Sequence, residues 1–400
     1  MDILKFAVVG IGNMGWVHAD QLFRGNVMHA MLSAVCDTDQ KKLEHAEMEF
    51  GGAIRCYADY RDMLAEGGFD AVIIATPHYM HTVIAMDAFE KGYHVLCEKP
   101  AGVLVKDVRE MNRKAKESGR TFGLMFNQRM NPLFSTLKEY IDLGMLGEIK
   151  RFVWIVNNWY RTQYYYDSAG WRATWHGEGG GVLLNQCPHN LDLWVWIMGM
   201  PAFLQAFCFE GKYHNIAVED DATIYAEYEN GATGVFITST GEYPGTNRLE
   251  ISGTYGKAVC EDGKLKLYLL NQDERDICFT SAQAMPVSRI VPIELTSKEG
   301  KEEHLQIIQN FTNHILYDEE LVAPGEEGIY SLMISNAAYL SSWIGKKVAV
   351  PVDDEEYAKY LHAKKDLPAE KRSWQYPVNN SSSEGNAGGN EYQERWKVRW

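Results

Sequence analysis

The sequence predicts an α/β protein of two domains: a doubly wound parallel sheet, then an α+β domain with a large, mostly antiparallel open sheet. Over the first 126 residues, short apolar runs alternate with segments of helical length, which is typical of a parallel sheet with helices on both faces. After about residue 148, strand-like runs follow one another without crossover helices, and turn signals such as Asn230-Gly231 and Asp262-Gly263 separate them. This second rhythm indicates mainly antiparallel pairing.

The first half supplies strands and helices in alternation. Nearly every residue of its strands is apolar, as expected of a sheet that is covered on both faces. The strands are expected at residues 6–9, 32–35, 71–74 and 94–96, and the helices at residues 14–24, 40–50, 81–91 and 106–118.

The second half supplies the antiparallel sheet, which needs helices over at least one face. Its strands are expected at residues 149–158, 202–210, 222–228, 233–240, 248–252 and 264–269. Helices are expected at residues 132–143, 190–198, 305–317 and 329–344.

The change of rhythm and the composition set the expected boundaries. The first domain covers residues 1–126 and the second covers 127–376, with a C-terminal helix that is a candidate to pack back on the first domain. Residues 377–390 are rich in Asn, Ser and Gly and are typical of a flexible linker. The aromatic and basic residues 391–400 fit either a frayed tail or a segment that docks on a neighbouring subunit.

Charge and composition exclude several classes of partner. The formal net charge of −15 argues against nucleic acid and against an anionic membrane surface, because both need a basic excess. We expect no membrane span, since no apolar stretch of about 18 residues occurs, and we read no targeting peptide at the N-terminus. The seven scattered cysteines show no C-x-x-C pair, which predicts reduced thiols and a cytoplasmic protein.

A glycine-rich turn follows the first expected strand. Gly10-Ile11-Gly12-Asn13-Met14-Gly15 matches G-x-G-x-x-G and opens the first expected helix, which is the context that this dinucleotide-binding, or Rossmann, fingerprint requires. The first glycine permits the tight turn, the second lets a pyrophosphate approach the backbone, and the third packs the helix on the sheet. The helix N-terminus attracts the phosphate charge.

Asp37 ends the second expected strand, 22 residues beyond Gly15. A carboxylate there accepts hydrogen bonds from ribose hydroxyls and repels a 2′-phosphate, so NAD is expected rather than NADP. The alternative is that Asp37 caps a helix or braces a turn, and Asp39 is an equal candidate for the cap.

Two further strand ends carry polar residues that are expected to line the ligand crevice, which forms at the carboxyl ends of parallel strands. Thr76 and Pro77 follow residues 71–74 and are expected beside the nicotinamide, with His81 one turn into the next helix. Glu98 and Lys99 follow the expected strand at residues 94–96. A buried lysine there has a lowered pKa or hydrogen-bonds a substrate oxygen, whereas a surface turn is the alternative.

His189 is the candidate general acid or base. It follows a triple glycine at residues 179–181, and Asn185 lies four positions before it. If this segment is helical, both side chains share one face, although Pro188 interrupts that register. An imidazole near neutral pKa on a crevice face suits proton transfer, and a structural hydrogen bond is the alternative.

Together these motifs resemble the Gfo/Idh/MocA family of oxidoreductases, the group that contains glucose–fructose oxidoreductase and inositol dehydrogenases. The glycine turn, Thr76-Pro77, Glu98-Lys99-Pro100 and the triple glycine with His189 occur in that family's order. Later stretches are also similar to that family, at residues 218–221, 248–253 and 336–353. The resemblance covers about residues 3–360.

The resemblance implies a Rossmann domain for nucleotide binding and a second domain for substrate binding, whose open sheet often forms oligomer contacts. It implies that Lys99 lies beside the nicotinamide and the reacting hydroxyl, that His189 is the general acid or base, and that Lys99-Pro100 is cis. A homodimer or homotetramer is expected. The resemblance also suggests residues that reach the cofactor, Trp171, Arg172 and Asn127, and one that lines the substrate pocket, Arg129.

The sequence departs from the family at Asn185, where many of its sugar dehydrogenases carry aspartate. An amide does not take a proton from a hydroxyl, so Asn185 is expected to orient the substrate or the imidazole. Proton transfer then rests on His189, with Lys99 helping electrostatically.

Aromatic residues are dense between the domains. They either stack on a sugar ring or belong to the core or a subunit interface, and Tyr160 and Trp175 are the expected substrate contacts among them. The group comprises Trp159, Tyr160, Tyr164, Tyr165, Tyr166, Trp171 and Trp175.

The sequence therefore predicts an NAD-dependent enzyme that transfers a hydride between the nicotinamide and a secondary hydroxyl of a sugar, glycoside or cyclic polyol. Two alternatives stay open: an NAD-dependent redox-neutral glycosidase of the same family, and a non-catalytic NAD- and sugar-binding regulatory protein. No metal is expected, because His176, Glu178 and His189 lack compact ligand spacing.

Overall fold

The computed structural model describes residues 3–296 and 303–365. The predicted linker, the predicted tail and the last residues of the predicted second domain lie outside this part of the chain.

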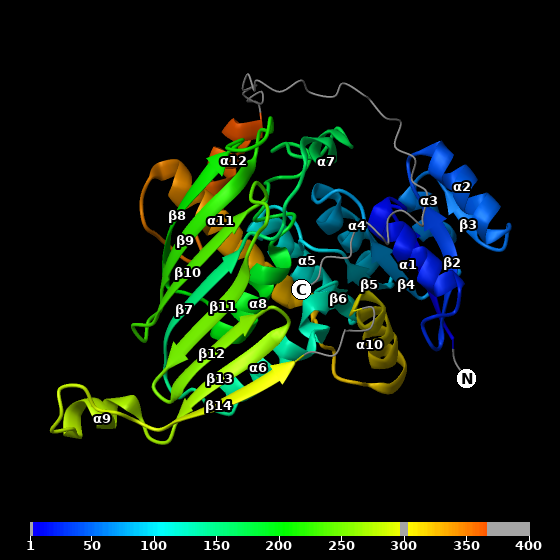
Figure 1. The fold of residues 1–400 in the computed structure, drawn as a ribbon. Helices are drawn as coiled ribbons and strands as arrows, with labels where there is room; N and C mark the ends of the chain where they lie inside the picture. The colour runs from blue at the N-terminus through cyan, green and yellow to red at the C-terminus, as the bar shows by residue number, and fades with distance from the viewer. Residues whose placement is uncertain (1–2, 297–302, 366–400) are drawn as a thin grey trace.

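The first sheet is six-stranded and parallel, with the strand order β3-β2-β1-β4-β5-β6 (Figure 1). Each expected strand and helix of this half is present within a few residues of its expected bounds, whereas no range was predicted for β3, α3 and β6. The elements are β1 Leu4–Val9, α1 Asn13–Phe23, β2 Ala30–Cys36, α2 Gln40–Phe50, β3 Arg55–Tyr57, α3 Tyr60–Glu66, β4 Ala71–Ile74, α4 Tyr79–Glu90, β5 His94–Cys97, α5 Val105–Ser118 and β6 Phe122–Leu124. The central strands are fully buried because helices cover both faces.

The second sheet has nine strands in the order β14-β13-β12-β11-β7-β10-β9-β8-β15. The predicted antiparallel pairing is confirmed except between β7 and β10, which run parallel. The strands are β7 Ile149–Val156, β8 Phe203–Glu210, β9 Glu219–Glu227, β10 Thr233–Ser239, β11 Asn247–Gly253, β12 Gly256–Glu261, β13 Lys264–Leu270, β14 Ile290–Thr296 and β15 Val348–Ala349.

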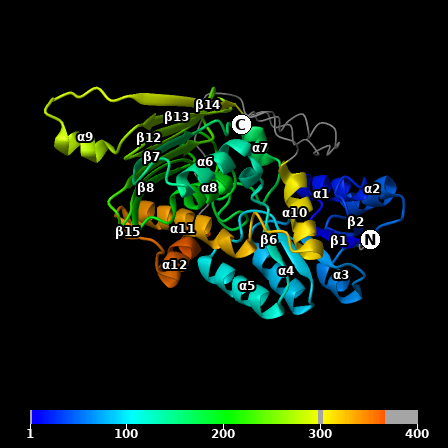
Figure 2. The ribbon, with the colours of Figure 1, turned by 90° about the horizontal axis from the view of Figure 1, so that it is seen from below.

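Helices cover one face of this sheet and separate it from the first sheet (Figures 1 and 2). Aromatic side chains fill the interface: Trp194 packs on Phe152 and Phe236, with ring centroids 4.9 and 5.8 Å apart. The remaining elements are η1 Asn127–Met130, α6 Pro132–Asp142, α7 Gln163–Asp167, α8 Pro188–Met198, α9 Glu274–Thr280, α10 Glu303–Tyr317, η2 Gly325–Glu327, α11 Gly328–Ile344 and α12 Asp354–Lys365.

Helix α10 returns to the first sheet although it follows the second sheet in the sequence. The Phe311 ring lies 6.3 Å from the Phe6 ring of β1, and the Gln309 side chain accepts the Met28 N–H. The C-terminal helix α12 packs on α5, where Asp354 pairs with Arg109. Both contacts join the two halves around the crevice described next.

Candidate active site

The glycine turn joins β1 to α1 and leaves one face of its backbone open. A Cβ at Gly10, whose φ is +85°, would lie 2.7 Å from the Ala75 carbonyl oxygen, and a Cβ at Gly15 would lie 1.7 Å from the Gly10 carbonyl oxygen. A Cβ at Gly12 would meet no described atom within 4 Å. Protein therefore packs against the first and third glycines, whereas the space over Gly12 fits the close approach of a pyrophosphate to a helix N-terminus.

Asp37 braces this turn from the end of β2. Its carboxylate accepts the Ile11 N–H at 2.9 Å and the Asp39 N–H at 2.9 Å, and Lys42 Nζ lies 3.1 Å away. Asp39, not Asp37, caps helix α2 by accepting the Lys41 N–H. The position of Asp37 beside Ile11 keeps it at the nucleotide turn, where its contact with a ribose stays a prediction.

Thr76 lies at the end of β4, and its buried hydroxyl has no hydrogen-bond partner among the described residues. His81 differs from the expected cofactor contact: its two ring nitrogens lie 2.7 Å from the Thr76 carbonyl and 2.8 Å from the Pro100 carbonyl. The imidazole thus connects the β4 and β5 loops. Pro77 follows Thr76 in the same loop, and its side-chain role stays a prediction.

Lys99 extends from the end of β5 into the crevice, and the Lys99-Pro100 bond is cis. Its ammonium donates to the Asn185 carbonyl at 2.9 Å. Burial lowers the pKa of Lys99, and the carboxyl groups of Glu98 and Glu178 oppose that effect. Lys99 is therefore a desolvated cation held near the backbone of the triple-glycine segment.

Glu98, the residue before Lys99, pairs with His18 of α1 at 2.7 Å. Burial raises the pKa of Glu98, but the hydrogen bond and charge of His18 outweigh it, so the pKa falls to about 2. Neither His18 nor His304 of α10 was predicted as a site residue. The two rings lie 6.0 Å apart, between their centroids.

His189 lies in the first turn of α8 and faces the same buried region. Burial, and then the charge of Lys99, hold the pKa of His189 well below its usual range. Its Nδ1 has no partner within the described ranges. The structure therefore brings a neutral imidazole within the electrostatic reach of Lys99.

The condition for Asn185 and His189 to share a helical face is not met, because α8 begins only at Pro188, the residue expected to interrupt the register. Asn185 lies in the preceding turns, where its backbone carbonyl accepts from Lys99 and its amide donates to Glu178. The proline lacks the N–H that a continuous helix needs in its interior.

Three further predicted residues border this region. Arg172 donates to the Tyr165 hydroxyl at 2.7 Å and stacks on the Trp171 ring, and Trp171 meets His78 edge to face. Asn127 donates to Glu303 of α10 at 3.2 Å. Their contacts to a cofactor stay predictions.

Arg129 is held by two carboxylates, and its expected place in the substrate pocket stays a prediction. Its side chain is 3% exposed and pairs with Asp192 at 2.6 Å and with Glu327 at 2.6 Å. This guanidinium joins η1 to α8 and η2, because a buried cation needs anionic partners.

Two of the expected sugar contacts, Trp175 and Tyr160, have neighbours within the protein, and their contacts to a substrate stay predictions. Trp175 is 3% exposed, donates to the Ala217 carbonyl and packs on Tyr339 and Trp343, so it belongs to the core. Tyr160 is exposed and lies beside Tyr243.

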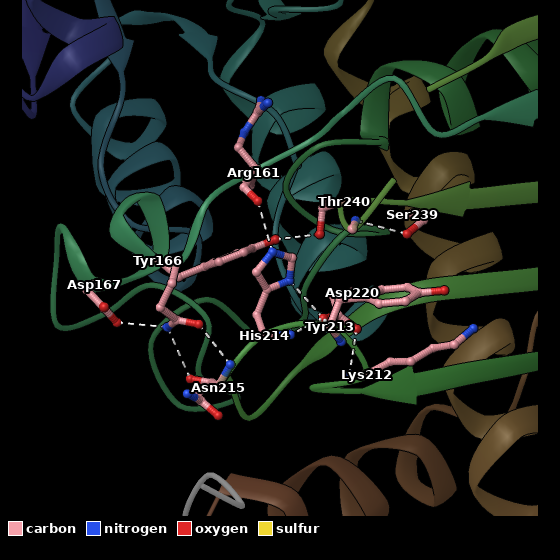
Figure 3. A network of polar contacts seen from close by, with 12 residues as sticks. Arg161, Tyr166, Asp167, Lys212, Tyr213, His214, Asn215, Asp220, Ser239 and Thr240 are labelled. Carbon is pink, nitrogen blue, oxygen red and sulfur yellow. Dashed lines mark hydrogen bonds and ion pairs between the residues drawn. The ribbon is translucent and has the colours of Figure 1, made fainter. Parts of the chain in front are cut away.

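A polar network joins Arg161 and Tyr166, which belong to the aromatic-rich residues 159–175, to the second sheet (Figure 3). Asp220 accepts the backbone N–H groups of Lys212, Tyr213 and His214. The His214 ring lies between the Asp220 carboxylate and the Arg161 carbonyl, each 2.9 Å away. The Tyr166 hydroxyl pairs with Thr240 at 2.7 Å, which fixes α7 beside the crevice.

Within residues 3–296 and 303–365 no group of three or more His, Cys, Asp or Glu side chains is arranged to hold a metal. In the same ranges no helix is long and apolar enough to cross a bilayer.

The parallel sheet with its open glycine turn, and the lysine that it places beside a buried imidazole, define an NAD-binding oxidoreductase. Residues 4–126 match the oxidoreductase family with an NAD-binding Rossmann fold, and residues 134–259 match the GFO/IDH/MocA C-terminal domain. The chain belongs to the GFO/IDH/MocA family, as the resemblance implied.

Similar proteins align over most of the chain. Myo-inositol 2-dehydrogenase of Thermotoga maritima is 24% identical and covers 84% of this chain and 95% of its own length. D-apiose dehydrogenase of Rhizobium rhizogenes is 27% identical, over 88% of this chain and 98% of its own. The WlbA dehydrogenase of Bordetella pertussis, solved with NADH and UDP-GlcNAcA, is 26% identical with a TM-score of 0.73, over 88% of this chain and 100% of its own.

Proposed function

We propose that this NAD-dependent oxidoreductase acts on a secondary hydroxyl of a sugar, glycoside or cyclic polyol. The observation that carries the proposal is the hydrogen bond from Lys99, after β5, to the Asn185 carbonyl, which holds the lysine against the segment that leads into α8 and the buried His189. The names of the relatives support the substrate class, since they include inositol and apiose dehydrogenases.

Lys99 and His189 have separate roles at the substrate hydroxyl. The Lys99 ammonium orients the substrate oxygen and stabilises negative charge that develops on it. His189 is neutral at neutral pH, because its pKa lies well below the usual range, so it accepts the hydroxyl proton. NAD, when bound along the turn at residues 10–15, supplies the nicotinamide ring that takes up a hydride.

The test incubates the full-length protein and NAD with inositols, glucosides, apiose and a UDP-linked uronic acid, and follows NADH absorbance. We expect one class to reduce NAD, and Lys99→Met to lose roughly 10²- to 10³-fold in kcat while its Kd for NAD stays unchanged. Wild-type turnover by Lys99→Met would remove the lysine from the mechanism. Aglycone release without net NADH would instead establish the redox-neutral glycosidase, and no reaction with any compound would favour the regulatory protein.

We also propose that the chain forms a homo-oligomer through the outer face of the nine-stranded sheet. In the described part of the chain, helices lie on the opposite face (Figure 1). Large apolar side chains point outward from β8 and β9, among them Phe203, Phe207, Phe209 and Tyr225, which are 41–55% exposed. A second copy of the same face would bury them.

A cytoplasmic location completes the proposal. All seven cysteines are free thiols, as expected in a reducing compartment.

A further inference from the structure

Asn185 is joined to two charged groups at once. Its backbone carbonyl accepts the Lys99 ammonium at 2.9 Å, and its side-chain amide donates to Glu178 Oε1. The residue that replaces the family's aspartate is therefore itself positioned by a carboxyl group that lies seven positions earlier in the sequence.

Glu178 is held firmly in this place. Its side chain belongs to a residue that is 1% exposed, and Oε2 accepts the Ala173 N–H at 2.6 Å. The charged groups that act on its carboxyl group are Arg172 in its own segment and Lys99 after β5, and the Tyr166 hydroxyl of α7 is coupled to it. His78, before α4, hydrogen-bonds the backbone carbonyl of Glu178 at 2.8 Å.

We propose that Glu178 is a positioning residue for hydride transfer: it fixes Asn185, whose carbonyl holds the Lys99 ammonium, and adds a second negative charge to that of Glu98 near the lysine. The proposal rests on the proposed function, because Lys99 must be a cation to stabilise the substrate oxygen.

The electrostatics agree with this geometry. Burial raises the pKa of Glu178 to about 7, although the Ala173 N–H, Arg172, Asn185 and Lys99 act against it. Glu178 also raises the pKa of Lys99, against the effect of burial. As the pH rises through about 7, Glu178 ionises and Lys99 gains a second counter-charge in addition to that of Glu98, which is ionised already.

The first test reads the protonation of Lys99 without any substrate. Lysines of wild type and Glu178→Gln are acetylated with trace acetic anhydride over a pH series, and peptide mass spectrometry follows Lys99 against the exposed Lys91. We expect the labelling midpoint of Lys99 to fall by about one pH unit or more in Glu178→Gln, because an opposite charge nearby has been removed. The midpoint of Lys91 stays fixed, and an unchanged Lys99 midpoint would overturn the proposal.

The second test uses the substrate that the panel identifies. We expect kcat/KM of the wild type to show an ionisation near pH 7 that Glu178→Gln lacks, with kcat lowered about tenfold or more and the Kd for NAD unchanged. Glu178→Asp, which keeps the charge, should restore the pH dependence. A merely structural role would lower activity equally at every pH and leave both midpoints in place.

Failure of the two proposals is distinguishable. A panel without a substrate would count against the proposed function while the labelling result still decides the role of Glu178 toward Lys99.

Discussion

Gly12→Ala separates cofactor binding from folding, because the structure gives the three glycines of the turn different surroundings. The Cβ of an alanine at position 12 meets no described atom within 4 Å, and the φ of Gly12, −69°, suits any L-residue. The methyl group would instead fill the space over the N-terminus of α1, where the pyrophosphate is expected.

The magnitudes follow from these positions. Gly12 is the N-cap of α1, and alanine is a poorer N-cap than glycine by roughly 0.5–1 kcal/mol, so the apo protein loses little stability. Displacing the pyrophosphate weakens at least one charge-assisted hydrogen bond, worth about 1.5–3 kcal/mol. That loss corresponds to a Kd for NAD that rises roughly 10- to 150-fold.

Calorimetric titration with NAD and urea unfolding of the apo protein measure the two effects. Gly15→Ala is the matched control: its Cβ would lie 1.7 Å from the Gly10 carbonyl, so it should destabilise the fold by about 1–3 kcal/mol or more. If Gly12→Ala bound NAD as tightly as the wild type, or unfolded as readily as Gly15→Ala, the assignment of this space to the pyrophosphate would be refuted.

Two other predictions concern the second half of the chain. Arg129→Met should lower the free energy of unfolding by about 3–5 kcal/mol in urea titrations, because it leaves the buried Asp192 carboxylate without its cation; a loss below about 1 kcal/mol would contradict this. Phe207→Glu should shift the oligomer toward smaller species in light scattering without changing the Kd for NAD, and an unchanged mass, or a monomeric wild type, would disprove assembly through this face.

Patterns of short range made much of the first domain predictable. The apolar runs, the glycine turn and Lys99 after β5 all lie within single strand–turn–helix units, so sequence spacing fixes their relative positions. By contrast, β3 was not predicted, because its three residues are too few for a periodic signal.

The surroundings of Lys99 are formed by residues remote in sequence, which short-range patterns do not predict. Its hydrogen bond to Asn185 spans 86 positions, and the Glu98–His18 pair spans 80. Glu178 carried no spacing signal either, and was considered only as a weak metal ligand. Nothing local indicates that a polar side chain will be buried beside a particular charge.

The sequence also did not indicate the internal partners of Arg129, Trp175 and His81. Each has the chemistry of a ligand contact, and each lies near a predicted site segment. Their partners in the structure are internal carboxylates, a packed aromatic cluster and two loop carbonyls. Residue type alone therefore did not reveal these internal partners.

By itself, the sequence predicted most strands and helices of the first sheet and the dinucleotide turn, which follow from local backbone preferences and from the period of apolar residues. Lys99 and His189 were named as candidates whose roles came from the resemblance to the family, and these roles stay predictions. Only the tertiary structure decided which polar groups surround that pair and what charge they carry, because burial and the distances between segments remote in sequence set both.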